Sequence, residues 1–440
     1  MNPVSVPLRT RFWGGDMRLT EDEKAMRDGA NGPAVARSMD LLIRYGEALD
    51  AERLVETRNV AGAFNASTPS VRHLAEDGFD RVFSELNLDS DDTIEIPRMA
   101  VPTCQLITGI DMENSALQGA DPALTEMQRQ SEKYLGQRGV NMMCTCTPYQ
   151  VGNVPVQGEH CAWMESSAVI YCNSVLGART NVEGKESTGA AALTGRIPYW
   201  GLHLPENRHA NRLIRVEAEV DDMADWGVLG YFTGFAVEEN RPAFERLTHQ
   251  PNLMKLKHFG AAAASSGGVE IYHMPGITPE APTMEAAFGT SAKPEAICFG
   301  AAEKRRTWER LQNATDRKLD FVMLGCPHNS IEQMSLVAEL LEGRRIHPDT
   351  ALWVHTPRAL RQIADRSGYT DVIRAAGGEV MSDTCPSISR RLPKGVRVIA
   401  TDSAKQAHYL PAIAKVQGWF GSVRQCVDSA VAGEWLGVVR

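Results

Sequence analysis

Residues 321–357 read FVMLGCPHNSIEQMSLVAELLEGRRIHPDTALWVHTP and carry the clearest structural pattern in the chain. The four apolar residues at 321–324 predict a buried strand, and the run at 352–355 predicts another. Between them we expect a helix over residues 330–342. A strand, a helix and a second strand in this order are typical of a parallel sheet with helices on its faces. The sequence therefore predicts an α/β fold.

The same alternation extends in both directions from this stretch. On the N-terminal side, residues 296–299 predict a strand. On the C-terminal side, Thr356 and Pro357 are suited to be the N-cap and first residue of a helix to about residue 375, which Gly377 and Gly378 end. Further expected elements are strands at 379–381 and 396–400 and helices that begin at about Ser403 and Ser422. We expect mostly parallel sheets flanked by helices, with ligands bound beyond the carboxyl ends of the strands.

The N-terminal half contains recognisable elements too. Thr20 is a suitable N-cap with Glu23 in capping-box position, and a further helix is expected at 34–45. The tract at 145–201 is polar and glycine-rich, as in a binding surface, and the small residues at 261–268 allow close backbone approach beneath a site. We expect three parts: an N-terminal extension at 1–16, N-terminal α/β lobes at 17–290 and a C-terminal α/β lobe at 291–440.

Three cysteines share one local setting. Cys146 lies in CTPY, Cys326 in GCPHN and Cys385 in DTCPS, and each follows a short run that predicts a strand. A proline one or two residues later stiffens each turn, because proline fixes its own backbone and disfavours helix for the residue before it. Three thiolates with an open fourth position suit iron or an iron–sulfur cluster that acts as a Lewis acid. Zinc is the alternative metal on chemistry alone.

The other six cysteines are expected to be small buried apolar residues without a role. They are Cys104, Cys144, Cys161, Cys172, Cys298 and Cys426. Cys144 is the hardest to set aside, because residues two apart in a strand share a face and it stands two residues from Cys146.

Composition narrows the class of protein. The 440 residues carry a net charge of −9 with no block rich in lysine and arginine, so we expect no nucleic-acid partner. No apolar run is long enough to cross a bilayer, and the N-terminal stretch does not resemble a signal peptide. Nine cysteines in such a chain indicate reduced thiols or metal ligands, and we expect a cytoplasmic protein.

Several polar residues are candidates for a site, each with a plainer alternative. Arg179 is suited to bidentate binding of a carboxylate or phosphate, or to an ordinary ion pair. His328, two residues after Cys326, would be an acid, a base or a support for a metal ligand, or else a capping or core histidine. Ser403 and Lys405 stand where a strand gives way to a helix, which is a natural anion seat, although capping alone would explain the serine.

Weaker candidates lie nearby. Ser166, Ser167 and Asn173 would supply donors and acceptors to a small polar ligand, or only loop and helix-cap bonds. His160 and His408 are weaker still.

Seven stretches, taken in order, resemble the catalytic large-subunit part of the aconitase X family, a branch of the aconitase superfamily. They are Leu19-Thr20-x-Asp22-Glu23, Cys146-Thr147-Pro148-Tyr149, residues 162–169, residues 173–181, Gly325-Cys326-Pro327-His328, Asp383-Thr384-Cys385-Pro386 and residues 401–409. The resemblance runs from about residue 17 to about residue 435. It implies a multi-lobed aconitase-like catalytic core with mostly parallel sheets flanked by helices.

The resemblance also implies an activity. The family contains hydro-lyases (dehydratases) that act on small hydroxy acids, so the first expectation is cis-3-hydroxy-L-proline, and phosphomevalonate or another hydroxy acid is the alternative. The matching cysteines Cys146, Cys326 and Cys385 would bind iron, with a [2Fe–2S] cluster favoured. The substrate loop would contain Ser166, Ser167, Asn173, Arg179 and Thr180, and the catalytic group would draw on His328, Ser403 and Lys405. Iron would help hydroxide, a poor leaving group, to depart.

The chain departs from the family pattern in three ways. The family needs a small swivel domain with a serine that is expected to act as the base. Residues 12–15 match only a short stretch of that domain. A separate small subunit is therefore predicted. Residues 59–62 read Asn-Val-Ala-Gly where the family often has a histidine near Asp-Gly, and 103–106 read Thr-Cys-Gln-Leu instead of Thr-Thr-Leu-Asn, although Asp111 follows as expected. These departures keep a third hypothesis open, a non-catalytic iron-binding protein on the same scaffold.

Overall fold

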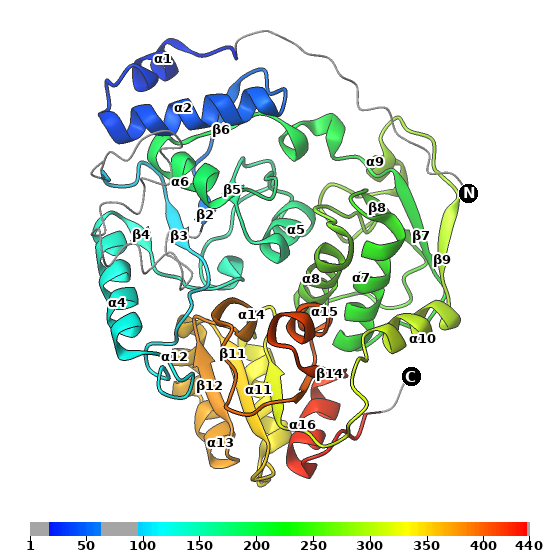
Figure 1. The fold of residues 1–440 in the computed structure, drawn as a ribbon. Helices are drawn as coiled ribbons and strands as arrows, with labels where there is room; N and C mark the ends of the chain where they lie inside the picture. The colour runs from blue at the N-terminus through cyan, green and yellow to red at the C-terminus, as the bar shows by residue number, and fades with distance from the viewer. Residues whose placement is uncertain (1–16, 63–95, 438–440) are drawn as a thin grey trace.

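The computed structural model describes residues 17–62 and 96–437 (Figure 1). The extension expected at 1–16 and the short swivel-like phrase at 12–15 lie outside these ranges. Within them, no helix has the length and apolar character needed to span a membrane.

The C-terminal part is built on a five-stranded parallel sheet in the order β12-β11-β10-β13-β14. The strands are β10 (Phe321–Leu324), β11 (Ala351–Thr356), β12 (Glu379–Ser382), β13 (Val398–Thr401) and β14 (Gln417–Phe420). The helices of this part are α11 (Ile331–Leu341), α12 (Arg358–Arg366), α13 (Tyr369–Ala375), α14 (Pro386–Ser389), α15 (Ala404–Ala414) and α16 (Val423–Ala432). The predicted α/β class with parallel sheets is confirmed.

The two faces of this sheet bury different partners, because successive side chains of a strand point to opposite sides. Val322 and Leu324 pack with α11 and α16 in one apolar cluster. Phe321 and Met323 point the other way, into a cluster that also contains all three candidate cysteines. The sheet therefore forms one wall of the site that the sequence predicted.

Two details of this region differ from the prediction. The single helix expected from Thr356 to residue 375 is two helices, because Gly368 adopts a left-handed backbone with φ 78° between α12 and α13. Thr356 ends β11, and its hydroxyl donates to the Asn329 carbonyl at 2.9 Å instead of capping a helix. Strand β14, with the sequence QGWF, was not predicted.

The N-terminal part contains a four-stranded parallel sheet in the order β4-β3-β2-β5 and a two-stranded antiparallel sheet. Its strands are β1 (Leu54–Glu56), β2 (Val60–Gly62), β3 (Thr103–Gln105), β4 (Val140–Asn141), β5 (Ala162–Trp163) and β6 (Arg196–Pro198), and its helices are α1 (Glu21–Arg27), α2 (Pro33–Ala48), α4 (Pro122–Gln137), α5 (Ser166–Ser174) and α6 (Lys185–Thr194). The capping box of Thr20 and Glu23 is present as predicted. The tract at 145–201 is less of a surface than expected, because α5 and α6 are largely buried.

The third unit holds a three-stranded parallel sheet in the order β8-β7-β9. Its elements are β7 (Arg212–Val216), α7 (Met223–Val237), β8 (Pro242–Glu245), α8 (Leu253–Gly267), α9 (Met284–Phe288), β9 (Ala296–Phe299) and α10 (Ala301–Arg310). The described residues before β7 also form the short 3₁₀ turns η2 (Pro148–Gln150), η3 (Gly201–His203) and η4 (Pro205–Asn207). Because β9 pairs with β7, the boundary expected between 290 and 291 falls inside this unit.

The three larger sheets lie around a common centre. Figure 1 shows the five-stranded sheet at the bottom, the three-stranded sheet on the right and the four-stranded sheet at the upper left, with α5, α8, α14 and α15 between them. Helix α8 packs against α5 and α15 as well as α7. The small residues at 261–268 lie in α8, as close packing beneath a central site requires.

Candidate active site

The three candidate cysteines converge at this centre. Cys146 comes from the loop after β4, while Cys326 and Cys385 follow β10 and β12 of the five-stranded sheet. All three are buried in one cluster with Ile107 and Trp353. Their thiols are close enough to affect one another electrostatically, and burial raises the pKa of each to about 12. A buried thiol of this kind ionises only when a cation or metal stabilises the thiolate.

The turn that presents Cys326 requires glycine. Gly325 has φ 98°, and a Cβ atom there would lie 2.2 Å from the His355 carbonyl oxygen. A side chain at this position would push β10 away from the end of β11. The glycine in GCPHN therefore sets the direction in which the cysteine leaves the sheet.

His328 connects the three cysteine loops. Its backbone N–H donates to Cys146 Sγ at 3.4 Å, its Nδ1 lies 2.9 Å from Thr145 Oγ1, and its Nε2 lies 3.0 Å from the Thr384 carbonyl oxygen. Since a carbonyl can only accept, Nε2 carries the proton and Nδ1 accepts from the threonine. Burial lowers the pKa of His328 to about 4. With both ring nitrogens engaged and the ring neutral, the arrangement favours the supporting role over the acid–base role.

Beside the cysteines stands an ion pair between Lys405 Nζ and Glu165 Oε1, whose side chains are 16% and 17% exposed. The Ser167 hydroxyl donates to Glu165 at 3.0 Å and accepts from Lys405 at 3.4 Å. Burial, the largest single cause, acts to lower the pKa of Lys405, but Glu165, Cys326 and Cys146 together raise it above its ordinary value. Burial is also the largest cause that acts to raise the pKa of Glu165, but Lys405 and Ser167 together lower it below its ordinary value. Both groups therefore stay charged.

Ser403 serves two partners. Its Oγ accepts from the Gln406 N–H at 3.1 Å as the N-cap of α15, and its side chain also bonds the Cys326 thiol. Both the capping role and the place beside the metal-ligand candidates are thus realised. Lys405, the second residue of α15, points its ammonium towards Glu165, the N-cap of α5.

Asn173 and Thr180 fix the shape of the predicted substrate loop. The Asn173 amide donates to the Thr180 carbonyl at 2.8 Å and accepts the Thr180 N–H at 3.1 Å, so the two residues close the loop on themselves. Arg208, which sequence reasoning missed, donates to Asn173 Oδ1 at 3.2 Å and pairs with Glu280 at 2.8 Å. The buried polar atoms of Asn173 have protein partners, which indicates a structural part for this residue.

Arg179 lies apart from the Lys405 group. Its Nη1 donates to the His203 carbonyl at 3.3 Å, and its Nε is buried without a hydrogen-bond partner. His160 lies beside it, with its Nδ1 2.9 Å from that of His203. Burial, with Arg179 adding to the effect, lowers the pKa of His160 to about 4. Ser166 opens helix α5 and lines a different cavity, which also contains Asn181 and Arg241.

The two segments whose sequence departs from the family pattern, 59–62 and 103–106, are linked by a series of hydrogen bonds. Asn59 Nδ2 donates to Asn153 Oδ1 at 2.5 Å, and Asn153 Nδ2 donates to Cys104 Sγ at 3.3 Å. Asn59 also accepts from the indole N–H of Trp163 at 2.8 Å. Trp163 stands two residues before Glu165, so this chain of contacts braces the segment that leads into the ion pair.

Other predictions have mixed outcomes. Five of the six remaining cysteines are buried as expected, but Cys298 is exposed on β9. His408 lies on α15, where its Nδ1 is 2.8 Å from the Tyr231 hydroxyl. Lys257 on α8 is a buried cation near Cys146 and Cys326 that no motif indicated.

The three thiols by themselves do not form a complete metal site. Over 17–62 and 96–437, no three His, Cys, Asp or Glu side chains form a group that could hold a metal ion. Yet the three thiols are soft ligands at one point of the fold. Soft thiolates suit iron, an iron–sulfur cluster or zinc.

Comparisons with known proteins agree with this architecture. Family models described as aconitase X first, second and third domain match residues 16–206, 210–309 and 319–432. The phosphomevalonate dehydratase large subunit of Methanothermobacter thermautotrophicus is 37% identical over 97% of this chain and 99% of that protein. The cis-3-hydroxy-L-proline dehydratase of Pseudomonas aeruginosa is 34% identical over 94% of this chain and 70% of that protein. The crystal structure of Thermococcus kodakaraensis aconitase X (holo-form) superposes with a TM-score of 0.79 and 31% identity, covering 94% of this chain and 100% of that one.

Proposed function

The chain belongs to the aconitase X family, a group of dehydratases within the aconitase superfamily, and we propose that it removes water from a small hydroxy acid, first of all cis-3-hydroxy-L-proline. The hydro-lyase class follows from its relatives, which are named dehydratases. One observation supports the proposal most strongly. The three cysteines meet beside a charged Lys405–Glu165 pair at the carboxyl ends of parallel strands.

We propose that Cys146, Cys326 and Cys385, which lie in one buried cluster, hold an iron–sulfur cluster of the [2Fe–2S] type. When bound, the cluster would supply the Lewis acid that weakens the bond from carbon to the departing hydroxyl. His328 would keep the three cysteine loops in place, because it bonds the segments that carry Cys146 and Cys385.

The charged pair would orient the substrate. Lys405 keeps its proton, since its pKa is raised, and an ammonium of this kind suits a carboxylate better than it suits proton abstraction. Glu165 keeps its negative charge and accepts from Ser167, so it fixes the position of Lys405. Ser403 stands beside Cys326 at the positive end of α15, where it would donate to an anionic group.

Phosphomevalonate is the second candidate, because relatives with 35% and 37% identity are named phosphomevalonate dehydratase large subunits. A phosphate would need several free cationic donors. Two described lysines lie near the cysteines: Lys405 is paired with Glu165, which leaves Lys257 as a single cation without a carboxylate within ion-pair distance. This charge balance favours the smaller hydroxy acid.

We also propose that a small swivel subunit completes the enzyme, since the relatives named large subunits imply a small partner. The partner would bring the base that removes the proton next to the carboxylate.

The test is anaerobic co-expression with a small swivel protein, followed by a screen of hydroxy acids for loss of water. We expect the purified pair to contain iron and sulfide and to dehydrate cis-3-hydroxy-L-proline. Dehydration of phosphomevalonate alone would move the proposal to the second substrate. An iron-loaded pair that dehydrates neither compound would favour the non-catalytic hypothesis.

A further inference from the structure

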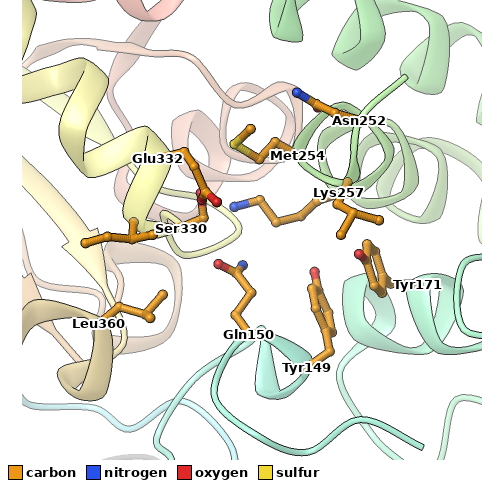
Figure 2. Close-up of a pocket in the computed structure, with 11 residues that line it drawn as sticks. Tyr149, Gln150, Tyr171, Asn252, Met254, Lys257, Ser330, Glu332 and Leu360 are labelled. Carbon is orange, nitrogen blue, oxygen red and sulfur yellow. The ribbon is translucent and has the colours of Figure 1, made fainter. Parts of the chain in front are cut away.

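A cavity of about 410 Å³ opens behind the cysteine loops (Figure 2). Its walls come from five elements: the turn after Cys146, Tyr171 of α5, the start of α8, the start of α11 and Leu360 of α12. None of the three cysteines is among the residues that line it, and neither are Glu165, Ser403 or Lys405. The cavity is therefore a separate space from the cysteine face of the site.

Lys257 supplies the positive charge in this cavity. Its side chain is 2% exposed, and its ammonium donates to the His328 carbonyl at 2.7 Å and to Gln333 Oε1. An ammonium has three donors, so one remains for a further partner. Among the described residues, no carboxylate lies within ion-pair distance of Lys257, although buried charges are normally paired.

Two further polar atoms in the cavity lack partners. The Tyr149 hydroxyl and Gln150 Oε1 are buried and make no hydrogen bond to any described residue. In Figure 2 the Gln150 amide and the Tyr149 hydroxyl point towards the Lys257 side chain, whose ammonium extends towards Ser330 and Glu332. The cavity thus gathers a cationic donor, a hydroxyl and an amide acceptor, each with capacity to spare.

The rest of the lining is apolar. Leu253, Met254, Ile331 and Leu360 form its walls, and Tyr149 stacks on Tyr171 with ring centroids 3.8 Å apart. A pocket with apolar walls and a few convergent polar groups is typical of a small-molecule site. Helices α8 and α11 both begin at the cavity, and their positive ends add to the attraction for an anion.

We propose that this cavity binds a small 2-amino or 2-hydroxy carboxylate. The ligand's carboxylate would accept hydrogen bonds from the Lys257 ammonium and the Tyr149 hydroxyl. Its amine or hydroxyl group would donate to Gln150 Oε1. This inference deepens the proposed function, because the class includes molecules that resemble its substrate. The apolar body of the ligand would lie against Leu360 and Ile331. Glu332 at the rim disfavours ligands with a second negative charge.

Occupancy of the cavity has a path to the cysteines. The His328 carbonyl accepts from Lys257 at 2.7 Å and from Gln150 Nε2 at 3.3 Å, while the His328 N–H donates to Cys146 Sγ. A ligand that draws Lys257 and Gln150 towards itself would weaken both bonds to this carbonyl. The absorption of the loaded cysteine site should then change when the cavity fills.

The probe is L-proline, which has the carboxylate and the amine but no hydroxyl to lose, so that binding is measured without turnover. Binding to the anaerobically loaded pair of subunits would be followed by calorimetry and by the visible absorption of the cluster. We expect L-proline to bind and L-prolinamide, which lacks the carboxylate, to bind at least about tenfold more weakly. Lys257→Met should weaken the binding of L-proline by a similar factor. Lys255, two residues away on α8, is paired with Asp221, so Lys255→Met should leave this binding unchanged.

Two variants keep the test independent of folding defects at Lys257. Tyr149→Phe removes the hydroxyl that lacks a hydrogen-bond partner, and Leu360→Trp fills the cavity from an apolar wall. Both variants should bind L-proline more weakly. Equal binding of L-proline and L-prolinamide, or unchanged binding in Leu360→Trp, would overturn the proposal. Dehydration is assayed separately, so a pair that binds L-proline at Lys257 but dehydrates nothing would contradict only the proposed function.

Discussion

Cys326 tests the ligand assignment at the scale of one residue. Serine keeps the size of the side chain but replaces a soft thiolate with a hard hydroxyl, so Cys326→Ser should lose most of its iron and its activity. Iron and sulfide content after anaerobic reconstitution is the measurement. Cys298→Ser is the matched control, because Cys298 is exposed on β9 and should be replaceable without loss. A Cys326→Ser protein with full iron content would refute the assignment.

The Lys405–Glu165 pair makes a prediction about stability. Lys405→Met leaves the largely buried Glu165 carboxylate without its partner, and the loss of unfolding free energy should approach but not exceed the about 3–5 kcal/mol of a fully buried pair. The double variant Lys405→Met/Glu165→Gln removes both charges and should recover much of this loss. Urea unfolding measures all three proteins. A double variant less stable than Lys405→Met would contradict the pairing.

The same pair gives the pH dependence its sign. Lys405 lowers the pKa of Glu165 in the folded protein. The contribution of Glu165 to the unfolding free energy is therefore fully present above its unfolded pKa of about 4.3 and is lost as the pH falls through its folded pKa. The folded pKa of Lys405 is raised, so its contribution is present below about 10.4 and is lost as the pH rises through the folded value. The stability difference between wild type and Lys405→Met should therefore shrink in strong acid.

At the scale of the element, the contact between α7 and α8 depends on small residues. A Cβ atom on Gly234 would lie 2.0 Å from Ser266 Oγ and 2.6 Å from the Ala263 carbonyl oxygen. Gly234→Ala should therefore separate the two helices and cost about 1–3 kcal/mol, as overpacking does. Because α8 carries Lys257 and packs on α15, iron retention should fall with stability.

Gly136→Ala on α4 is the control for this helix contact. Gly136 lies inside a helix with open space around it, so alanine should stabilise the protein by up to about 1 kcal/mol. Thermal unfolding of the two variants should move in opposite directions. Stabilisation by Gly234→Ala would show that the two helices are not in close contact.

At the scale of the whole molecule, Asp111 joins the N-terminal lobe to the five-stranded sheet. Its carboxylate is fully buried, accepts the Ser382 N–H at 2.8 Å and accepts from Asn114 at 2.7 Å. Ser382 ends β12, three residues before Cys385. Asp111→Asn turns one acceptor into a donor that faces the Ser382 N–H, and hydrogen bonds to charged groups contribute about 1.5–3 kcal/mol.

We expect Asp111→Asn to lower the unfolding free energy by about that amount and to weaken iron retention at Cys385. Urea unfolding and iron content after dialysis check the two effects. Glu113→Gln is the control, since Glu113 pairs with Arg358 and Arg361 but is itself 55% exposed. Equal effects of the two variants would show that burial at Asp111 does not matter.

Sequence reasoning was most successful where local pattern and chemistry coincide. Alternating strands and helices gave the parallel C-terminal sheet, and the shared proline-bearing turns picked out Cys146, Cys326 and Cys385, which the fold brings into one buried cluster. It was less successful where a single residue acts through distant partners. His328 was expected among the catalytic residues, but only the folded chain shows that both its ring nitrogens bond other loops.

The sequence by itself determined the fold class, the family and the choice of three candidate ligands, because periodicity, turn chemistry and long ordered motifs are properties of neighbours along the chain. Tertiary structure alone decided what stands around those ligands. Lys257, Asn153 and Asp111 belong to no motif that indicated their partners, and they reach the site from segments more than 30 residues from Cys326. The burial and charge of a site depend on which segments lie around it, and long-range packing determines which segments those are.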